Sequence, residues 1–395
     1  MAFLPVNSFS LRLPVAIYAM LTFGVAALFV ATVASGPKPL ALDFDPYWSA
    51  AHLTLGGHAR DAYSNVVIEA FERAHTRMDE EGYLAFYYPP PYLMLCLPLG
   101  LLPYVPALLA FLTAQAAVLW IVLTRILRQG WALLPLLAYP GFLMNVLSGQ
   151  NGGFSAACFG AALLWLERRP ALAGACLGFL VCKPQIALAV PLALFAARRW
   201  RAACASAATA AALCGASFLV LGRDAWAGFF ANAPAARGDL ETLSFKWRMM
   251  QSFYADIRIA GGNLALGYAG QALLAAVAVA LLARICWLRR GAGPEMSALC
   301  VTALLVTPFL YDYDLMIAVP ALAWLTAEAV RTGLLRGERA LLLVLYFTPF
   351  LAVGFGRFLG VPLAPPLLLA LLLAIGRRAE TQPDGRLAAA SPGMV

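Results

Sequence analysis

Short clusters of aspartate, amide and lysine side chains interrupt an otherwise apolar sequence. The first cluster holds Asp43 and Asp45, the last holds Asp312 and Asp314, and Lys183 lies between two apolar runs in the middle of the chain. A carboxylate can accept a proton from a hydroxyl group or bind a substrate hydroxyl, and a lysine can hold a phosphate. The candidate site residues are Asp43, Asp45, Gln150, Asn151, Lys183, Gln185, Arg248, Gln251, Asp312 and Asp314.

The chain that carries these clusters is mostly apolar. Of its 395 residues, 62% are hydrophobic and 12% are charged, and its mean hydropathy is +0.78. Soluble domains are about 45–50% apolar and about 25% charged. The composition therefore excludes a soluble enzyme, a disordered protein and, despite a net charge of +8, a nucleic-acid-binding protein. We expect an all-α polytopic membrane protein.

Apolar stretches with almost no charge predict about twelve helical segments, because a spanning helix takes about 20 residues. Several stretches are shorter, so we expect tilted, broken or half helices among them. A further apolar piece at 91–102 lies between prolines and predicts an interfacial or re-entrant helix. The twelve stretches are 14–34, 105–124, 131–147, 152–166, 171–182, 184–197, 202–221, 264–283, 296–310, 315–330, 340–355 and 361–375.

Lysine and arginine residues set the expected orientation, because cytoplasmic turns of membrane proteins are enriched in them. With the N-terminus in the cytoplasm, the turns on that side hold 17 of the 28 basic residues. Both termini are then cytoplasmic, and we expect a single transmembrane domain over 1–380 with a disordered cytoplasmic tail at 381–395. Two long loops, 36–90 and 222–262, fall on the exoplasmic side.

This orientation places the polar clusters on the exoplasmic side of the membrane. Charged and amide side chains at membrane depth are costly, so by default they face a cavity in which they have a function. We therefore expect one polar site there, roofed by the two long loops. An enzyme would use such a site for catalysis, and the class of protein that competes with this interpretation is a transporter or flippase for a lipid-linked glycan. Transporters show internal repeats and bind near the bilayer midplane, and no repeat is evident in this sequence.

The first loop predicts two short helices. Pro46 suits the first position of a helix that runs to Leu55, so Asp45 is the expected N-cap and Asp43 has no capping role. A second helix over 65–78 is expected to lie on the membrane surface. Its apolar face would hold Val67, Phe71, Ala74 and Met78.

The other candidates each have a structural alternative to a binding role. Lys183 can bind a phosphate or extend from a helix break to the membrane surface. Gln150 and Asn151 can contact a sugar or form a turn, and Arg248 can bind a phosphate or orient its loop.

The last aspartate pair is expected to contribute one side chain to the site. Asp312 and Asp314 are two residues apart at a helix start, so they point to different sides. One of them is expected to bind a substrate hydroxyl or to pair with Lys183, and the alternative is an N-cap for the next helix.

Metal binding is not expected. The spacing of Asp43 and Asp45 matches an Asp-x-Asp metal motif, but that motif serves nucleotide sugars, which are absent from the exoplasmic side. The three histidines lack a ligand spacing. The eight cysteines lie in apolar segments without the spacing of a zinc site or a disulfide framework.

The polar clusters, in their order along the chain, resemble those of glycosyltransferase family 87 in the GT-C superfamily. The resemblance covers about 40 to 330. The last cluster departs from those members that carry a histidine near it, since the histidines of this chain are His52, His58 and His75. The matching stretches are DFDPYWSAA (43–51), GGHARDAY (56–63), YYPPPY (87–92), SGQNG (148–152), KPQ (183–185), RRWR (198–201) and TPFLYDYD (307–314).

The resemblance implies a GT-C-like fold and an inverting transfer of a hexose, typically mannose, from a polyprenyl-phosphate donor to a lipid-linked or glycan acceptor. It implies Asp43 as the catalytic base, acting on the exoplasmic side of a bacterial-type plasma (inner) membrane. Lys183, Arg248 and Arg258 are the available cations for the leaving phosphate, so no metal or other cofactor is expected. The expected partners are the donor, the acceptor and membrane lipid, without nucleic acid.

Overall fold

The computed structural model describes residues 8–77, 84–128, 133–242 and 247–381. Within these ranges the chain is all-helical, and its β-structure is limited to isolated bridges that join Leu40 to Arg77 and Met250 to Tyr311. This agrees with the predicted all-α class.

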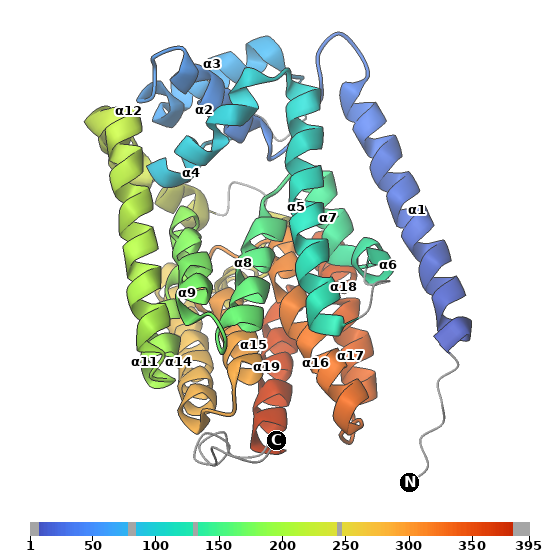
Figure 1. Cartoon of the computed structure of the whole chain (residues 1–395). Coiled ribbons are helices and arrows are strands. Elements are labelled where there is room, and N and C mark those ends of the chain that lie inside the picture. Colours follow the sequence, from blue (N-terminus) through green and yellow to red (C-terminus); the bar gives the residue numbers. More distant parts are fainter. Residues whose placement is uncertain (1–7, 78–83, 129–132, 243–246, 382–395) are drawn as a thin grey trace.

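The helices of the first loop, together with those of the apolar piece at 91–102, form a separate layer at one end of the molecule, called here the first-loop layer (Figure 1). The start of α1 and the end of α19 lie at the opposite end. The elements of this layer are α2 (Asp45–Leu55), η1 (Asp61–Tyr63), α3 (Asn65–His75), α4 (Pro90–Cys96) and η2 (Leu97–Leu101).

The remaining helices form the bundle beneath this layer. Its first half holds α1 (Ser8–Ala34), α5 (Tyr104–Leu127), α6 (Leu133–Leu137), α7 (Pro140–Ser148), α8 (Gly152–Trp165), α9 (Pro170–Gly178), η4 (Phe179–Cys182), α10 (Pro184–Ala187), α11 (Val190–Ala196) and α12 (Trp200–Thr242). Its second half holds η5 (Trp247–Met249), α13 (Phe253–Ile259), α14 (Leu264–Leu288), α15 (Ala292–Val306), η6 (Asp312–Ala318), α16 (Val319–Thr332), α17 (Glu338–Tyr346), α18 (Thr348–Gly354), η7 (Phe355–Leu359) and α19 (Ala364–Thr381).

Every predicted apolar stretch overlaps a helix, but several are interrupted. The stretch 131–147 is divided into α6 and α7, and 340–355 into α17 and α18, because α7 and α18 each begin with a proline in the first turn. Within the described residues, five helices are long and apolar enough to cross a membrane. The number of twelve segments therefore stays a prediction.

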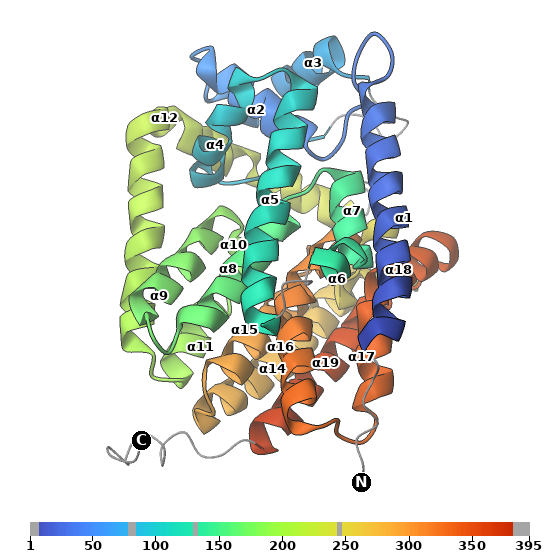
Figure 2. The same ribbon diagram turned by 45° about the vertical axis from the view of Figure 1, so that its right-hand side comes forward.

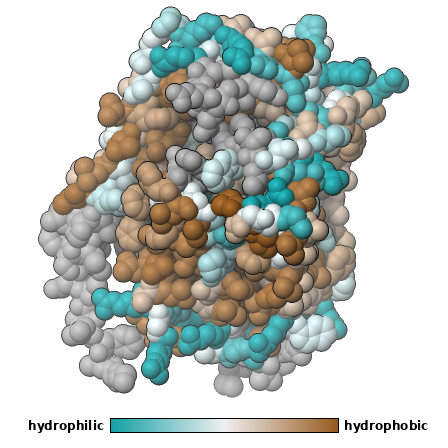
Figure 3. Space-filling model, turned by 180° about the vertical axis from the view of Figure 1, so that it is seen from behind, coloured by the Kyte–Doolittle hydropathy of each residue, from teal (hydrophilic) through white to brown (hydrophobic). Residues whose placement is uncertain are grey.

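An apolar surface covers the middle of one face of the molecule. Seen from behind, brown residues predominate between teal residues at the top and bottom (Figure 3). Helix α1 exposes Met20 and Leu28 by 64% and 71%, whereas every residue of α15 from Met296 to Leu305 is buried. A helix that is apolar on all sides lies in a core or in a membrane. Helix α15 forms the core, and the exposed α1 is long and apolar enough to cross a membrane.

The predicted second loop, 222–262, is largely helical in the structure. Helix α12 continues to Thr242 beyond a kink at Gly222, whose φ of 76° and ψ of 173° suit glycine. Past the kink, α12 approaches the first loop, and a Cβ at Gly228 would lie 3.2 Å from the carbonyl oxygen of Arg60. Figure 2 shows α12 along the edge of the bundle, bending over at its upper end. The sequence predicts a loop here because glycine, proline and charged residues are typical of loops.

A buried ion pair ties three helices together at the end opposite the first loop. Arg378 of α19 is 2% exposed, and its Nε donates to Glu338 Oε1 of α17 at 2.7 Å. Its Nη1 donates to Thr332 Oγ1 and its Nη2 to the carbonyl oxygen of Gly333, at 2.7 and 2.6 Å. These bonds fix α16, α17 and α19 relative to one another.

Arg378→Met is expected to lower the stability of the protein by roughly 3–5 kcal/mol, because it leaves the Glu338 carboxylate buried without its cation. Thermal and denaturant unfolding of the purified protein in detergent measures the loss. Arg377→Met, a change at the exposed neighbouring position, is the control and should shift stability by about 0.5 kcal/mol or less. Equal melting temperatures and equal denaturant midpoints for the two variants would contradict this prediction.

Candidate active site

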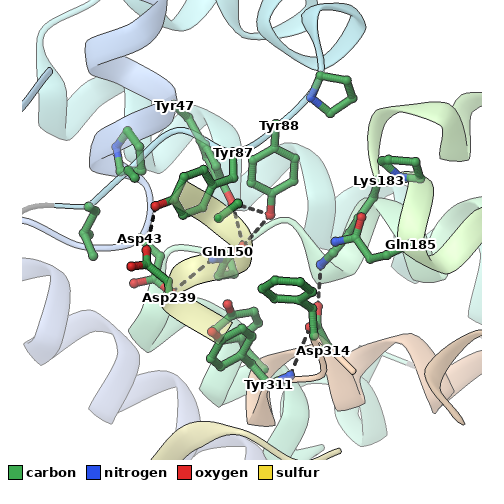
Figure 4. A pocket seen from close by; sticks show the side chains of 18 of the residues that line it. Asp43, Tyr47, Tyr87, Tyr88, Gln150, Lys183, Gln185, Asp239, Tyr311 and Asp314 are labelled. Atoms are coloured by element: carbon green, nitrogen blue, oxygen red, sulfur yellow. Dashed lines mark hydrogen bonds and ion pairs between the residues drawn. The ribbon is translucent and has the colours of Figure 1, made fainter. Parts of the chain in front are cut away.

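A cavity of about 510 Å³ lies between the first-loop layer and the bundle. Figure 4 shows Asp43 and Asp239 on one side, Lys183 and Gln185 on the other, and tyrosines between them. The lining residues are Asp43, Pro46, Tyr47, Arg73, Leu84, Ala85, Tyr87, Tyr88, Pro89, Gln150, Lys183, Pro184, Gln185, Ala236, Asp239, Phe309, Tyr311, Tyr313 and Asp314. Four of the polar clusters predicted from the sequence therefore meet in one place.

Asp43 is held where the first loop crosses the end of α7. Its backbone N–H donates to the carbonyl oxygen of Ser148 at 2.9 Å, and its Oδ2 accepts from Gln150 Nε2 at 3.0 Å. Gly149 ends α7 with a φ of 68°, and a Cβ there would lie 2.9 Å from Phe44 Cβ. Glycine is thus required for the close approach that brings Gln150 to Asp43.

Gln150 connects this carboxylate to the tyrosines of the cavity. Its Oε1 accepts from the hydroxyl groups of Tyr47 at 2.5 Å and Tyr88 at 3.3 Å. The hydroxyl oxygens of Tyr47 and Tyr88 also lie within hydrogen-bond distance of each other, at 2.9 Å. Because Gln150 uses its N–H on Asp43 and its oxygen on the tyrosines, the network holds the carboxylate in one orientation.

Lys183 and Asp314 form a buried ion pair on the other side of the cavity. Both side chains are nearly inaccessible, and Lys183 Nζ donates to Asp314 Oδ1 and, at 3.4 Å, to Asn151 Oδ1. The backbone N–H of Tyr311 donates to Asp314 Oδ2 at 3.2 Å. Lys183 directly precedes Pro184 and α10, so the break between η4 and α10 places the ammonium group in the cavity.

Asp312 and Gln251 are buried outside the cavity lining. Only Asp314 of the last aspartate pair lines the cavity, as expected for side chains two residues apart. The Gln251 backbone N–H donates to the carbonyl oxygen of Leu310 at 2.7 Å, and its Nε2 to that of Ala352 at 3.2 Å. Gln251 thus positions the chain next to the cavity.

One of the cations considered for the leaving phosphate lies apart from this geometry. Arg258 donates to the carbonyl oxygen of Glu241 at 3.0 Å, at the end of α12, and does not line the cavity. The side chain of Arg248, the other candidate in this loop, lies outside the part of the chain that the structure describes.

Asp45 is not the N-cap of α2, contrary to the prediction. Phe44 occupies that position without a side-chain cap, and Asp45 is fully buried. Its carboxylate accepts from Ser49 Oγ at 3.0 Å and Thr76 Oγ1 at 2.6 Å, so it joins α2 to the end of α3. Burial raises the pKa of the Asp45 carboxyl, while the hydrogen bonds from Thr76 and Ser49 oppose the rise.

A second buried carboxyl in the first loop supports the wall of the cavity. Helix α3 ends at His75, three residues before the predicted end, and buries Glu72. Glu72 Oε2 accepts from the backbone N–H of Leu84 at 3.1 Å, where the wall segment 84–89 begins. Burial and the nearby Asp45 charge raise the pKa of Glu72. The predicted contact of α3 with the membrane stays a prediction.

Asp239, Tyr87 and Arg73 line the cavity and were not among the predicted site residues. Tyr87 donates to Asp239 Oδ2 at 2.6 Å, which joins the first loop to the outer half of α12. Arg73 pairs with Glu69, and more than half of its side chain is exposed. The one signal for Asp239 in the sequence was its place in the second exoplasmic loop.

This set of side chains suits a sugar phosphate. Carboxylates and amides bind hydroxyl groups, tyrosine rings provide apolar walls, and a buried lysine attracts a phosphate. Within the described residues, no group of three or more His, Cys, Asp or Glu side chains is arranged to hold a metal ion. The independence from metal stays a prediction.

The fold and the cavity define a helical membrane protein with a polar, tyrosine-lined binding site. The chain belongs to glycosyltransferase family 87, whose family model matches residues 86–311, more than half of its length. Of the cavity residues, the match includes Gln150, Lys183 and Asp239 and leaves out Asp43 and Asp314. Searches of curated proteins and of solved structures gave no match.

Proposed function

We propose that this glycosyltransferase moves a hexose, expected to be mannose, from a polyprenyl-phosphate donor to a lipid-linked or glycan acceptor. The observation that carries the proposal is the placement of Asp43 and Lys183 around one cavity, with a proton acceptor on one side and a cation on the other.

Asp43 acts as the general base in this proposal. The acceptor hydroxyl oxygen attacks the anomeric carbon and forms the new glycosidic bond, while the bond from that carbon to the phosphate oxygen breaks. The electron pair leaves with polyprenyl phosphate, and the hydroxyl proton goes to Asp43. Attack from the side opposite the phosphate inverts the anomeric configuration.

Lys183 holds the phosphate in this proposal. The negative charge that develops on the leaving oxygen is stabilised by a positioned cation, and Lys183 is buried where water competes little. Gln185, two residues further along the chain, also lines the cavity with a half-buried side chain. A cation of the chain in this place makes the transfer independent of metal.

The site is proposed to lie on the exoplasmic side. The first-loop layer lies at the end of the bundle opposite the start of α1 and the end of α19 (Figure 1), and the excess of basic residues favours a cytoplasmic location for those two ends. The family assignment favours transfer over the alternative of a lipid-linked glycan transporter.

Purified protein in liposomes tests this proposal with radiolabelled polyprenyl-phosphate mannose and a lipid extract of the source organism. We expect a labelled glycolipid whose new bond has the anomeric configuration opposite to that of the donor, in equal yield with and without EDTA. Loss of product in EDTA would refute metal independence. Absence of product with polyprenyl-phosphate mannose and glucose alike would refute the donor class, and a flipping assay on the same liposomes would test the transporter.

A further inference from the structure

The outer half of α12 delivers a carboxylate to the cavity that the proposed reaction does not use. Asp239 is half-buried and lines the cavity beside Asp43 (Figure 4). Its Oδ2 accepts from Tyr87, and its Oδ1 has no hydrogen-bond partner among the described residues. The carboxylate of this lining residue therefore keeps an acceptor oxygen that no described residue uses.

Hydrogen bonds fix both the carboxylate of Asp239 and the end of the helix that carries it. Beyond it, the end of α12 is fixed by Arg258, which donates to the carbonyl oxygen of Glu241, and by the Tyr254 hydroxyl, which donates to that of Leu240 at 3.4 Å. Tyr87 fixes the carboxylate itself. A fixed acceptor loses little conformational freedom when a ligand binds, which favours a binding role.

Charge divides the cavity into two ends. Asp43 and Asp239 both lie near enough to Tyr311 to interact with it electrostatically, and they face Lys183 and Gln185 across the cavity (Figure 4). Arg73 also lines the cavity, but both its Nε and Nη2 donate to Glu69 Oε1, at 2.9 and 2.7 Å. Asp314 pairs with Lys183, so the lysine end is close to neutral, whereas Asp43 and Asp239 make the other end negative and repel a phosphate.

We propose that Asp239 binds a hydroxyl group of the acceptor sugar and makes this end of the cavity selective for uncharged sugars. This inference rests on the proposed function, since it assigns the lysine end to the donor phosphate. The rings of Tyr311 and Tyr313 lie parallel, with centroids 5.4 Å apart and an interplanar angle of 14°, and offer an apolar surface to a sugar ring. The acceptor class is therefore a neutral, hydroxyl-bearing sugar without a phosphate near its reacting hydroxyl.

Direct binding tests the inference without requiring transfer. The protein in nanodiscs that contain polyprenyl phosphate, which occupies the lysine end, is titrated with methyl α-mannoside and, separately, with mannose 6-phosphate, and both are followed by ligand-observed NMR. We expect the wild type to prefer the neutral sugar. Asp239→Asn should weaken binding of methyl α-mannoside by roughly 10-fold, the usual contribution of a charge-assisted hydrogen bond to affinity. It should also reduce the ratio between the affinities for methyl α-mannoside and for mannose 6-phosphate.

Two further variants separate direct contact from positioning. Glu241→Gln, the same kind of change two residues further along α12 and outside the cavity lining, should leave both affinities within about twofold of wild type. Tyr87→Phe removes the hydrogen bond to Oδ2 but leaves Oδ1, so its effect should be smaller than that of Asp239→Asn. An effect of Tyr87→Phe as large as that of Asp239→Asn would show that Asp239 acts through Tyr87, and would overturn the inference.

The remaining outcomes also decide the matter. No preference of the wild type for the neutral sugar, or equal affinities in wild type and Asp239→Asn, would overturn the inference. Where transfer is active, Asp239→Asn should raise the half-saturating amount of the acceptor extract and leave the donor KM unchanged, and a change in donor KM alone would overturn it. Absence of transfer in the wild type refutes the proposed function and leaves the binding result to stand by itself.

Discussion

Replacing Asp43 with asparagine is expected to lower kcat of sugar transfer by roughly 10²- to 10⁴-fold, the usual contribution of a general base. The donor KM should stay close to that of wild type, because Lys183 and Gln185 are unchanged. Asparagine keeps an oxygen that can accept from Gln150 Nε2, the bond that orients residue 43. The variant should therefore fold normally, so a melting curve and a kinetic titration on one preparation separate chemistry from folding.

Asp45→Asn is the matched control for this change. Asp45 lies two residues further on, is fully buried and does not line the cavity. Its partners are Ser49 and Thr76, so the substitution should affect the stability of the first loop while kcat stays within a few-fold of wild type. Retained kcat in Asp43→Asn would refute the assignment of the base, and Asp314 and Asp239 would be tested next.

The second large effect is expected at Lys183. Lys183→Met leaves Asp314 buried beside a neutral side chain, which costs roughly 3–5 kcal/mol of stability when a buried pair is broken. It also removes the cation proposed to hold the donor phosphate, which should raise the donor KM by roughly 10- to 100-fold. Thermal unfolding in detergent and donor titration measure the two effects on the same preparation.

A double variant distinguishes these two roles of Lys183. In the double variant Lys183→Met with Asp314→Asn, both charges of the pair are removed. Its melting temperature should therefore be much closer to that of wild type than the melting temperature of Lys183→Met alone. The donor KM should remain raised, because no cation has been restored. Recovery of the donor KM in the double variant would show that Lys183 serves only to neutralise Asp314 and would refute its role in phosphate binding.

The convergence of the polar clusters could be predicted from the sequence, because orientation follows from basic residues and buried polar groups need a cavity. The structure does place Asp43, Gln150, Lys183, Gln185 and Asp314 around one cavity. Their roles stay predictions. The all-α class and the helical segments followed from composition and from the lengths of apolar stretches.

The place of Asp239 in the cavity could not be predicted from the sequence, because it depends on the continuation of α12 beyond the kink at Gly222. Gly222, Pro234 and the neighbouring charges are typical of a loop, and only packing against the first loop, at Gly228, favours the helical continuation. Asp45 shows the same limit. Its local pattern favours an N-cap, but Thr76, distant in sequence, takes its carboxylate instead.

The walls of the cavity come from stretches that extend from Asp43 to Asp314, and several hydrogen bonds join stretches far apart in the chain. Tyr47 reaches Gln150, and Tyr87 reaches Asp239. Each of these bonds has one end in the first loop and the other in the bundle. A chimera that exchanges the first loop with that of a relative must therefore exchange both bundle partners as well, and fragments of the chain cut between them would each carry an incomplete site.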